Sequence, residues 1–216
     1  MKRLIQAILY FVILAPSIGI GMEFSPSRIL EKNECHTVQI DVCMAVLAQG
    51  EIKSGDTEAL KKIIEKIEKF AALKTQIGMI VFDSKGGNVQ ESLKMGRYIR
   101  SRQFATFVTH DSICASACIF AYSGGVFRVP VGPLIIHSFY SKEFEDTGNY
   151  TEADKKYNIM ADEIEKYLKE MRINRTLLDK IISIPHFTNK TLTLEENENF
   201  GLFGMDPVYA QTRRKN

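Results

Sequence analysis

A serine and a histidine in suitable surroundings are the residues of this chain with the clearest chemical potential. Ser116 lies among small residues in segment 114–118 (Cys-Ala-Ser-Ala-Cys), and His137 ends the apolar segment 134–136. Acyl transfer needs a serine hydroxyl exposed at a tight turn and a base supplied by a different element. Upstream, segment 83–87 (Asp-Ser-Lys-Gly-Gly) follows an apolar stretch, and its glycines can bring backbone N–H donors close to a substrate. The three segments predict a nucleophile, a base and an oxyanion-binding loop.

The composition is that of one globular domain without a strongly charged partner. The chain has 216 residues, of which 45% are hydrophobic, and this is enough for a sizeable core. Its formal net charge is +2, and Lys2 and Arg3 account for that excess. A neutral remainder argues against nucleic acid or an anionic membrane as the main partner. The basic tail 211–216 is interpreted as a solvated terminus.

The N-terminus has the layout of a secretory signal peptide. A cationic start precedes the apolar run Leu4–Leu14, which Pro16 interrupts and small residues follow as far as Gly21. The run is short for a membrane span, so cleavage after Gly21 is favoured over an uncleaved anchor. We therefore expect export to a bacterial periplasm or secretion, and no stable membrane span after cleavage of residues 1–21.

Export changes the interpretation of the cysteines, which are Cys35, Cys43, Cys114 and Cys118. An oxidising compartment favours disulfides, and four cysteines allow three pairings. Local pairing, 35 with 43 and 114 with 118, is preferred, and the second bridge would stiffen the turn at Ser116. The alternative is that they are small buried thiols. No cluster of histidines and acids has zinc-ligand spacing, so no metal is expected.

Apolar segments alternate between helical and strand-like spacing along the chain. Helices are predicted over 57–73, 88–102, 117–122, 151–171 and 174–183, and strands over 38–47, 77–82, 104–109, 126–129 and 134–137. Asn88 with Glu91 forms a start resembling a capping box, and Ser116 opens the short third helix. The order β-α-β-α-β-β predicts a parallel-rich α/β core with right-handed crossovers.

Segment 77–139 resembles the ClpP-like serine peptidases of the ClpP/crotonase superfamily, and in particular their exported single-domain bacterial relatives. The similarity rests on Ser-Lys-Gly-Gly at 84–87, where the family has Ser-Pro-Gly-Gly, and on the small-Ser-small turn at 115–117. A Gly-Gly turn, Arg128 and the strand leading to His137 follow in the family's order. The resemblance implies an α/β fold of repeated β-β-α units, a mostly parallel sheet with flanking helices, over a domain spanning 22–210. Arg128 could pair with a carboxylate or face a subunit, and the resemblance favours a structural or interface role.

The resemblance also implies roles for individual residues. Ser116 would attack an acyl carbonyl, and His137 would take its proton. The amides of Gly87 and Ala117 would bind the oxyanion, with Gly86 shaping the loop. Asn189 falls where the family has the third triad residue, an aspartate, although a local shift of the alignment could bring His186 there. Asparagine can orient an imidazole but cannot stabilise imidazolium by charge, which predicts weakened turnover.

The leading hypothesis is an exported, ATP-independent serine hydrolase, a peptidase acting on peptides or unfolded segments without a cofactor. The resemblance implies a homo-oligomer. A non-catalytic binding or scaffold protein of the periplasm is the main alternative, and Asn189 favours it. Crotonase-type chemistry on an acyl thioester is a third interpretation, which export disfavours because coenzyme A esters are cytoplasmic.

Overall fold

A six-stranded sheet forms the centre of the computed structural model, which describes residues 21–30, 43–71, 77–138, 150–185 and 187–213. The strands, in spatial order, are β1 (Glu23–Leu30), β2 (Cys43–Gln49), β3 (Ile77–Asp83), β4 (Ala105–Val108), β6 (Phe127–Pro130) and β9 (Gly204–Met205). The four central strands, β2, β3, β4 and β6, pair in parallel, whereas β1 and β9 pair antiparallel at the two edges. The predicted parallel-rich α/β core is confirmed.

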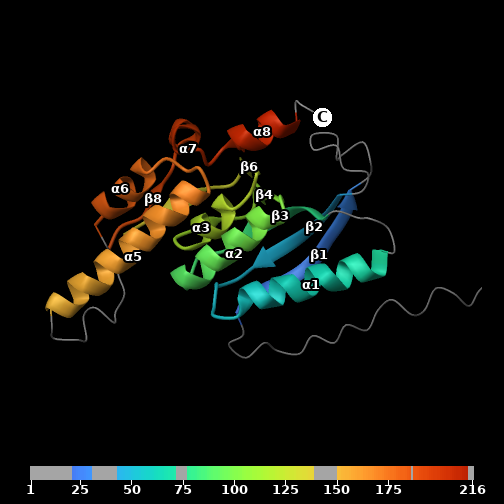
Figure 1. The fold of residues 1–216 in the computed structure, drawn as a ribbon, viewed down its shortest axis with the longest axis horizontal. Helices are drawn as coiled ribbons and strands as arrows, with labels where there is room; N and C mark the ends of the chain where they lie inside the picture. Colours follow the sequence, from blue (N-terminus) through green and yellow to red (C-terminus); the bar gives the residue numbers. More distant parts are fainter. Residues whose placement is uncertain (1–20, 31–42, 72–76, 139–149, 186, 214–216) are drawn as a thin grey trace, which may run out of the picture.

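Helices cover this sheet. They are α1 (Asp56–Ala71), α2 (Val89–Ser101), α3 (Cys118–Ser123), α5 (Tyr150–Glu170), α6 (Thr176–Ser183), α7 (Leu194–Phe200) and α8 (Pro207–Arg213). In Figure 1, α1 lies along β1 and β2, whereas α5, α6 and α7 gather at the other end of the molecule. Among the residues described, no helix combines the length and the hydrophobicity needed to cross a membrane.

A second, smaller sheet carries the residues of chemical interest. Its order is β5 (Cys114–Ala115), β7 (Leu134–Ile136) and β8 (Lys190–Thr191). Strands β5 and β7 are parallel, and β8 pairs with β7 in the antiparallel sense. The sequence predicts β7 but not β5 or β8, because two-residue strands are too short for a hydrophobic period to be visible.

The edge strand β1 is also absent from the sequence prediction. Its segment contains Pro26 and several polar residues, which are unfavourable inside a sheet but tolerated at an edge. The pairing of β1 with β2 changes register between Pro26 and Ile29, which is where the missing N–H would otherwise interrupt the ladder. The strand forms because β2 offers it a partner, a condition that lies outside the segment itself.

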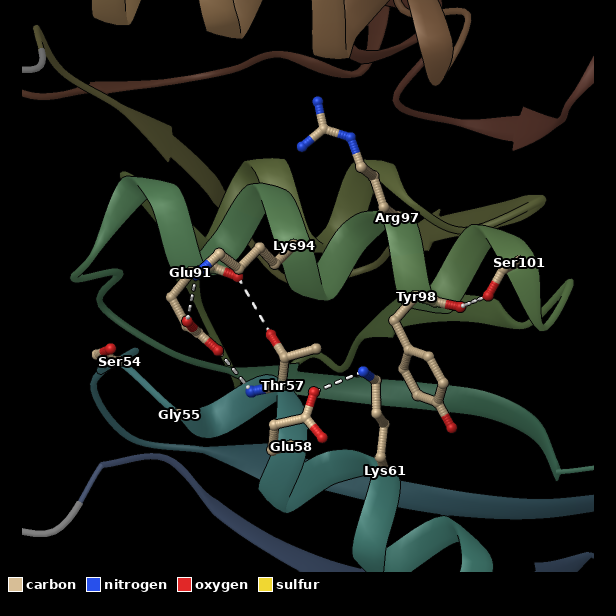
Figure 2. A pocket seen from close by; sticks show the side chains of 10 residues that line it. All are labelled: Ser54, Gly55, Thr57, Glu58, Lys61, Glu91, Lys94, Arg97, Tyr98 and Ser101. Atoms are coloured by element: carbon tan, nitrogen blue, oxygen red, sulfur yellow. Dashed lines mark hydrogen bonds and ion pairs between the residues drawn. The ribbon is translucent and has the colours of Figure 1, made fainter.

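The predicted capping box of α2 forms only in part, because Glu91 caps a different helix. The Asn88 side chain accepts a hydrogen bond from the Glu91 amide at 2.8 Å, as the prediction requires. The Glu91 carboxylate, however, accepts the Thr57 amide of α1 at 2.8 Å, and the Thr57 hydroxyl donates to the Glu91 carbonyl at 3.4 Å (Figure 2). Burial alone would raise the pKa of Glu91, but the bonds from Thr57, together with the Gly55 backbone and the charge of Lys94, outweigh it and hold the pKa below its usual range. Glu91 thus fastens the start of α1 to α2.

An open groove of about 620 Å³ runs between α1 and α2 beside this contact. Figure 2 shows its lining, which comprises Ser54, Gly55, Thr57, Glu58, Lys61, Glu91, Lys94, Arg97, Tyr98 and Ser101. Its cations have partners: Lys61 pairs with Glu58, Lys94 lies 3.7 Å from Glu91, and Arg97 pairs with Glu170 of α5. The groove is therefore a solvated face whose cations already have partners, and none of its residues lines the pocket at Ser116.

Arg128 is a structural residue that binds carbonyls rather than a carboxylate. Its side chain is buried, and its guanidinium donates to the carbonyls of Ser123, Gly201 and Met171 at 3.0, 2.7 and 2.8 Å. Burial lowers the pKa of Arg128 to about 10, which leaves it charged at neutral pH. The pairing with a carboxylate considered from the sequence is wrong. One buried cation instead joins the C-terminal ends of α3, α5 and α7.

Candidate active site

Ser116 occupies a strained position in the turn between β5 and α3. Its φ is +54°, in the left-handed region that costs a residue with a Cβ about 1 kcal/mol or more. The turn is fixed on two sides, because the Ser116 amide donates to Ile135 of β7 at 2.8 Å and the Ala115 amide donates to Ser84 at 2.9 Å. The Ser116 carbonyl accepts the Ile119 amide, but α3 itself begins only at Cys118, one residue later than predicted. Strain held in place by its surroundings is typical of functional sites.

A disulfide closes this turn. Cys114 at the start of β5 is bonded to Cys118 at the start of α3, with 5.3 Å between their Cα atoms, and both side chains are fully buried. The local pairing predicted for these two cysteines is confirmed, and the interpretation of the pair as free thiols is wrong. The pairing predicted for Cys35 with Cys43 lies outside the described residues.

His137 follows β7 at the same end of the small sheet as Ser116. Ala115 pairs with Ile135 in the parallel register, so the residues that follow each strand leave on the same side. The Nδ1 atom of His137 lies 2.7 Å from the Ser138 carbonyl. A carbonyl can only accept, so Nδ1 carries a proton, and in the neutral imidazole Nε2 then has the lone pair. The neighbouring backbone thus sets the tautomer that a general base needs.

Ser116 and His137 line one small pocket. The other lining residues are Val89, Ala117, Phe120, Ile136 and Ile181. Its space for solvent centres is about 10 Å³, which is room for roughly one water molecule. Within the described residues, the Ser116 hydroxyl has no hydrogen-bond partner, so it is not committed to capping α3. The sequence gives no sign of Phe120 or Ile181 in this role, because which face of a helix meets a site depends on packing.

The glycine loop packs directly against the nucleophile turn. Gly86 and Gly87 have φ values of +97° and +138°, and the Gly86 amide donates to the Ser84 hydroxyl at 3.1 Å. A Cβ on Gly86 would lie 2.6 Å from the Ala115 carbonyl oxygen and 2.7 Å from Cβ of Ser116. Only glycine permits that approach.

Two amides near the serine remain available to a ligand. Ile52 and the residues beside Gly87 exchange backbone bonds, the Ile52 amide donating to Gly86 and the Asn88 amide donating to Ile52. Neither the Gly87 amide nor the Ala117 amide donates to an acceptor in the described part of the chain. These are the two N–H groups expected to bind an oxyanion, and that assignment stays a prediction.

Asn189 lies across from His137 but does not contact it through a hydrogen bond. In the antiparallel pairing of β7 with β8, Ile136 faces Lys190, so one further step places His137 opposite Asn189. The Asn189 side chain is exposed, and in the described residues the Nδ1 partner is Ser138 instead. Its assignment as third triad member stays a prediction, and the alternative, His186, lies outside the described residues. No group of three or more metal-ligating side chains occurs where the chain is described.

Comparison with solved structures identifies the fold. Neither a protein-family model nor a curated protein matches the chain. ClpP1 from Listeria monocytogenes is similar with a TM-score of 0.50 and 20% identity, over 74% of this chain and 88% of that one. A point mutant of the same protein gives a TM-score of 0.52 with the same identity and coverage. The membrane-bound stomatin-specific protease 1510-N has a TM-score of 0.47 and 15% identity, over 80% of this chain and 83% of that one. The chain has a ClpP-like fold, as the resemblance implied.

Proposed function

We propose that this chain is an exported, ATP-independent serine hydrolase of the peptidase type, with Ser116 as nucleophile and His137 as general base. The observation that carries the proposal is the Ser116 turn. A strained serine, whose hydroxyl has no hydrogen-bond partner in the described part of the chain, shares a pocket with a histidine whose tautomer is set for accepting a proton. A serine that served only as a helix cap would use its hydroxyl on the first turn of α3.

The chemistry follows from these groups. Nε2 of His137 takes the Ser116 proton as Oγ attacks the acyl carbonyl, and the amides of Gly87 and Ala117 bind the resulting oxyanion. His137 then protonates the departing amine or alcohol, which leaves an acyl group on Ser116. Water, activated by the same imidazole, releases that group. Each oxyanion donor contributes about 3 kcal/mol to lowering the barrier.

The partner of His137 sets the expected speed. The Ser138 carbonyl orients the ring through its dipole, but it carries no net charge with which to stabilise the imidazolium that forms during attack. A carboxylate would supply that charge, and none lines the pocket among the residues described. We therefore propose that the hydrolase is slow. As further parts of the proposal, it acts on peptides or unfolded segments and self-associates.

Export forms part of the proposal. Removal of residues 1–21 leaves a chain that begins at Met22, the first residue of the domain proposed over 22–210. The Cys114–Cys118 disulfide supports an oxidising compartment, because such bonds persist in periplasmic and secreted proteins and are rare in the cytosol.

Hydrolysis by purified mature chain tests the proposed function. Wild type should release p-nitrophenol from p-nitrophenyl acetate and cleave unfolded casein, and Ser116→Ala should lower kcat by more than about 10³-fold. Ser183→Ala, which changes an exposed serine of α6, should leave kcat unaltered. Equal rates for wild type and Ser116→Ala would contradict the proposal and favour the non-catalytic binding protein.

Two variants at Asn189 separate its role from that of Ser138. Asn189→Ala should lower kcat less than about tenfold, because the Ser138 carbonyl and not Asn189 holds Nδ1. Asn189→Asp should raise kcat, since a carboxylate opposite His137 stabilises its charged form. The comparison is made by steady-state kinetics at several pH values. If Asn189→Asp lowered kcat as much as Ser116→Ala does, position 189 would have a different function.

A further inference from the structure

The pocket beside Ser116 is apolar and almost filled. Apart from Ser116 and His137, every lining residue is hydrophobic, and Ala117, Phe120, Ile136 and Ile181 are each at most 3% exposed. Burying a charged or strongly polar group against such walls is unfavourable unless it finds a partner. The group that enters this pocket is therefore uncharged.

The walls of the pocket differ in how firmly they are held. Phe120 is fixed twice by Tyr167 of α5, whose hydroxyl donates to the Phe120 carbonyl and whose ring meets the Phe120 ring edge-on at 6.4 Å. Ile136 belongs to β7 and Ala117 to the disulfide-closed turn. Ile181 comes from the eight-residue helix α6, which contributes no other residue to the lining. Ile181 is thus the wall whose size can be changed without altering the catalytic groups.

The position of the pocket identifies the part of the substrate that enters it. Its lining includes Ala117, whose amide is expected to bind the carbonyl oxygen, and Val89, which follows the glycine loop. Ser116 also lines the pocket, and the acyl group is the part of the substrate that becomes attached to Ser116, so the substituent on the acyl carbon lies beside these walls.

We infer that Ile181 restricts this site to small apolar acyl groups, such as acetyl or the acyl side of an alanine or glycine residue. The inference rests on the proposed function and deepens it by naming the substrate class. Space for about one water accommodates a methyl group and excludes a longer chain. A longer acyl group must displace Ile181, which costs at least about tenfold in kcat/KM for the longest chains tested.

Esters of increasing chain length test the inference. We would measure kcat/KM for p-nitrophenyl acetate, butyrate and hexanoate with wild type, Ile181→Ala and Ile182→Ala. Ile182 is the adjacent residue of α6 and is 41% exposed, so it makes a matched control. Wild type should prefer acetate over hexanoate by at least about tenfold, and Ile181→Ala should shift that ratio toward hexanoate by about tenfold or more. Ile182→Ala should leave the ratio unchanged.

A milder variant guards against loss of the fold. Ile181→Val removes one methyl group and should shift the butyrate-to-acetate ratio in the same direction, by about threefold. Preference of wild type for hexanoate, or equal shifts with Ile181→Ala and Ile182→Ala, would overturn the inference. Absence of Ser116-dependent hydrolysis of all three esters would overturn the proposed function, and the inference with it.

Discussion

Gly86→Ala is expected to remove most hydrolytic activity and to destabilise the domain. The new Cβ would lie 2.6 Å from the Ala115 carbonyl oxygen, 2.7 Å from Cβ of Ser116 and 2.9 Å from the Ala117 amide nitrogen. These atoms belong to the nucleophile turn, so any relief of the clash moves the nucleophile or an oxyanion donor. A misplacement near 1 Å costs about 100-fold in rate. The clash and the left-handed φ together cost about 3 kcal/mol of unfolding free energy.

Gly55→Ala is the matched control for that substitution. Gly55 has a φ of +98°, nearly the same as the +97° of Gly86, but a Cβ added there would have no atom within 4 Å. It carries the backbone penalty, about 1 kcal/mol, without the clash. We expect the free energy of unfolding, measured with urea, to fall less than in Gly86→Ala, and kcat/KM to stay at the wild-type value. Equal losses of activity in the two variants would show that the contact with the Ser116 turn is unimportant.

The double variant Cys114→Ala/Cys118→Ala is expected to lose both stability and activity. Opening a five-residue loop removes about 2 kcal/mol through chain entropy in the unfolded state. The bridge also spans Ser116, whose φ of +54° is unfavourable for serine, and its loss lets the turn relax. We expect kcat to fall by about tenfold or more, measured beside urea unfolding.

Dithiothreitol distinguishes this bridge from the remaining cysteines. The dithiol reduces the disulfide to two thiols and is itself oxidised to a cyclic disulfide. The activity of wild type should therefore fall when the protein is pre-treated with denaturant and reductant together. The same treatment should not lower the activity of the double variant in this way. A double variant that folds and retains wild-type kcat would show that the disulfide does not hold the nucleophile turn.

The local sequence pattern predicts those helices and strands that do not depend on one particular neighbouring element. The amphipathic spacing of 57–73 and 88–102 and the apolar run of 77–82 correspond to α1, α2 and β3 within a few residues, because helices and buried strands carry their own period. The two-residue strands β5, β8 and β9 have no period, and β1 depends on β2. The Glu91 carboxylate accepts a hydrogen bond from the Thr57 amide of α1, and a local sequence motif cannot reveal this contact between two helices.

The site divides in the same way. The order and spacing of Ser116, His137 and the glycine loop are visible in the sequence, because the glycine loop and His137 follow apolar strands and Ser116 lies among small residues. The partner of His137 is not, because a backbone carbonyl has no sequence signature. The pocket wall formed by Ile181 is equally hidden, since it depends on how α6 packs beside the small sheet.

Reaction with a fluorophosphonate tests the central claim, that Ser116 is an activated nucleophile. Purified mature chain would be treated with the probe, and the adduct located by intact mass and peptide mapping. The account predicts one adduct per chain, on Ser116, which is absent from Ser116→Ala, slowed in His137→Ala and unchanged in Ser183→Ala. A folded wild-type chain that forms no adduct, or forms it at another residue, would contradict the account.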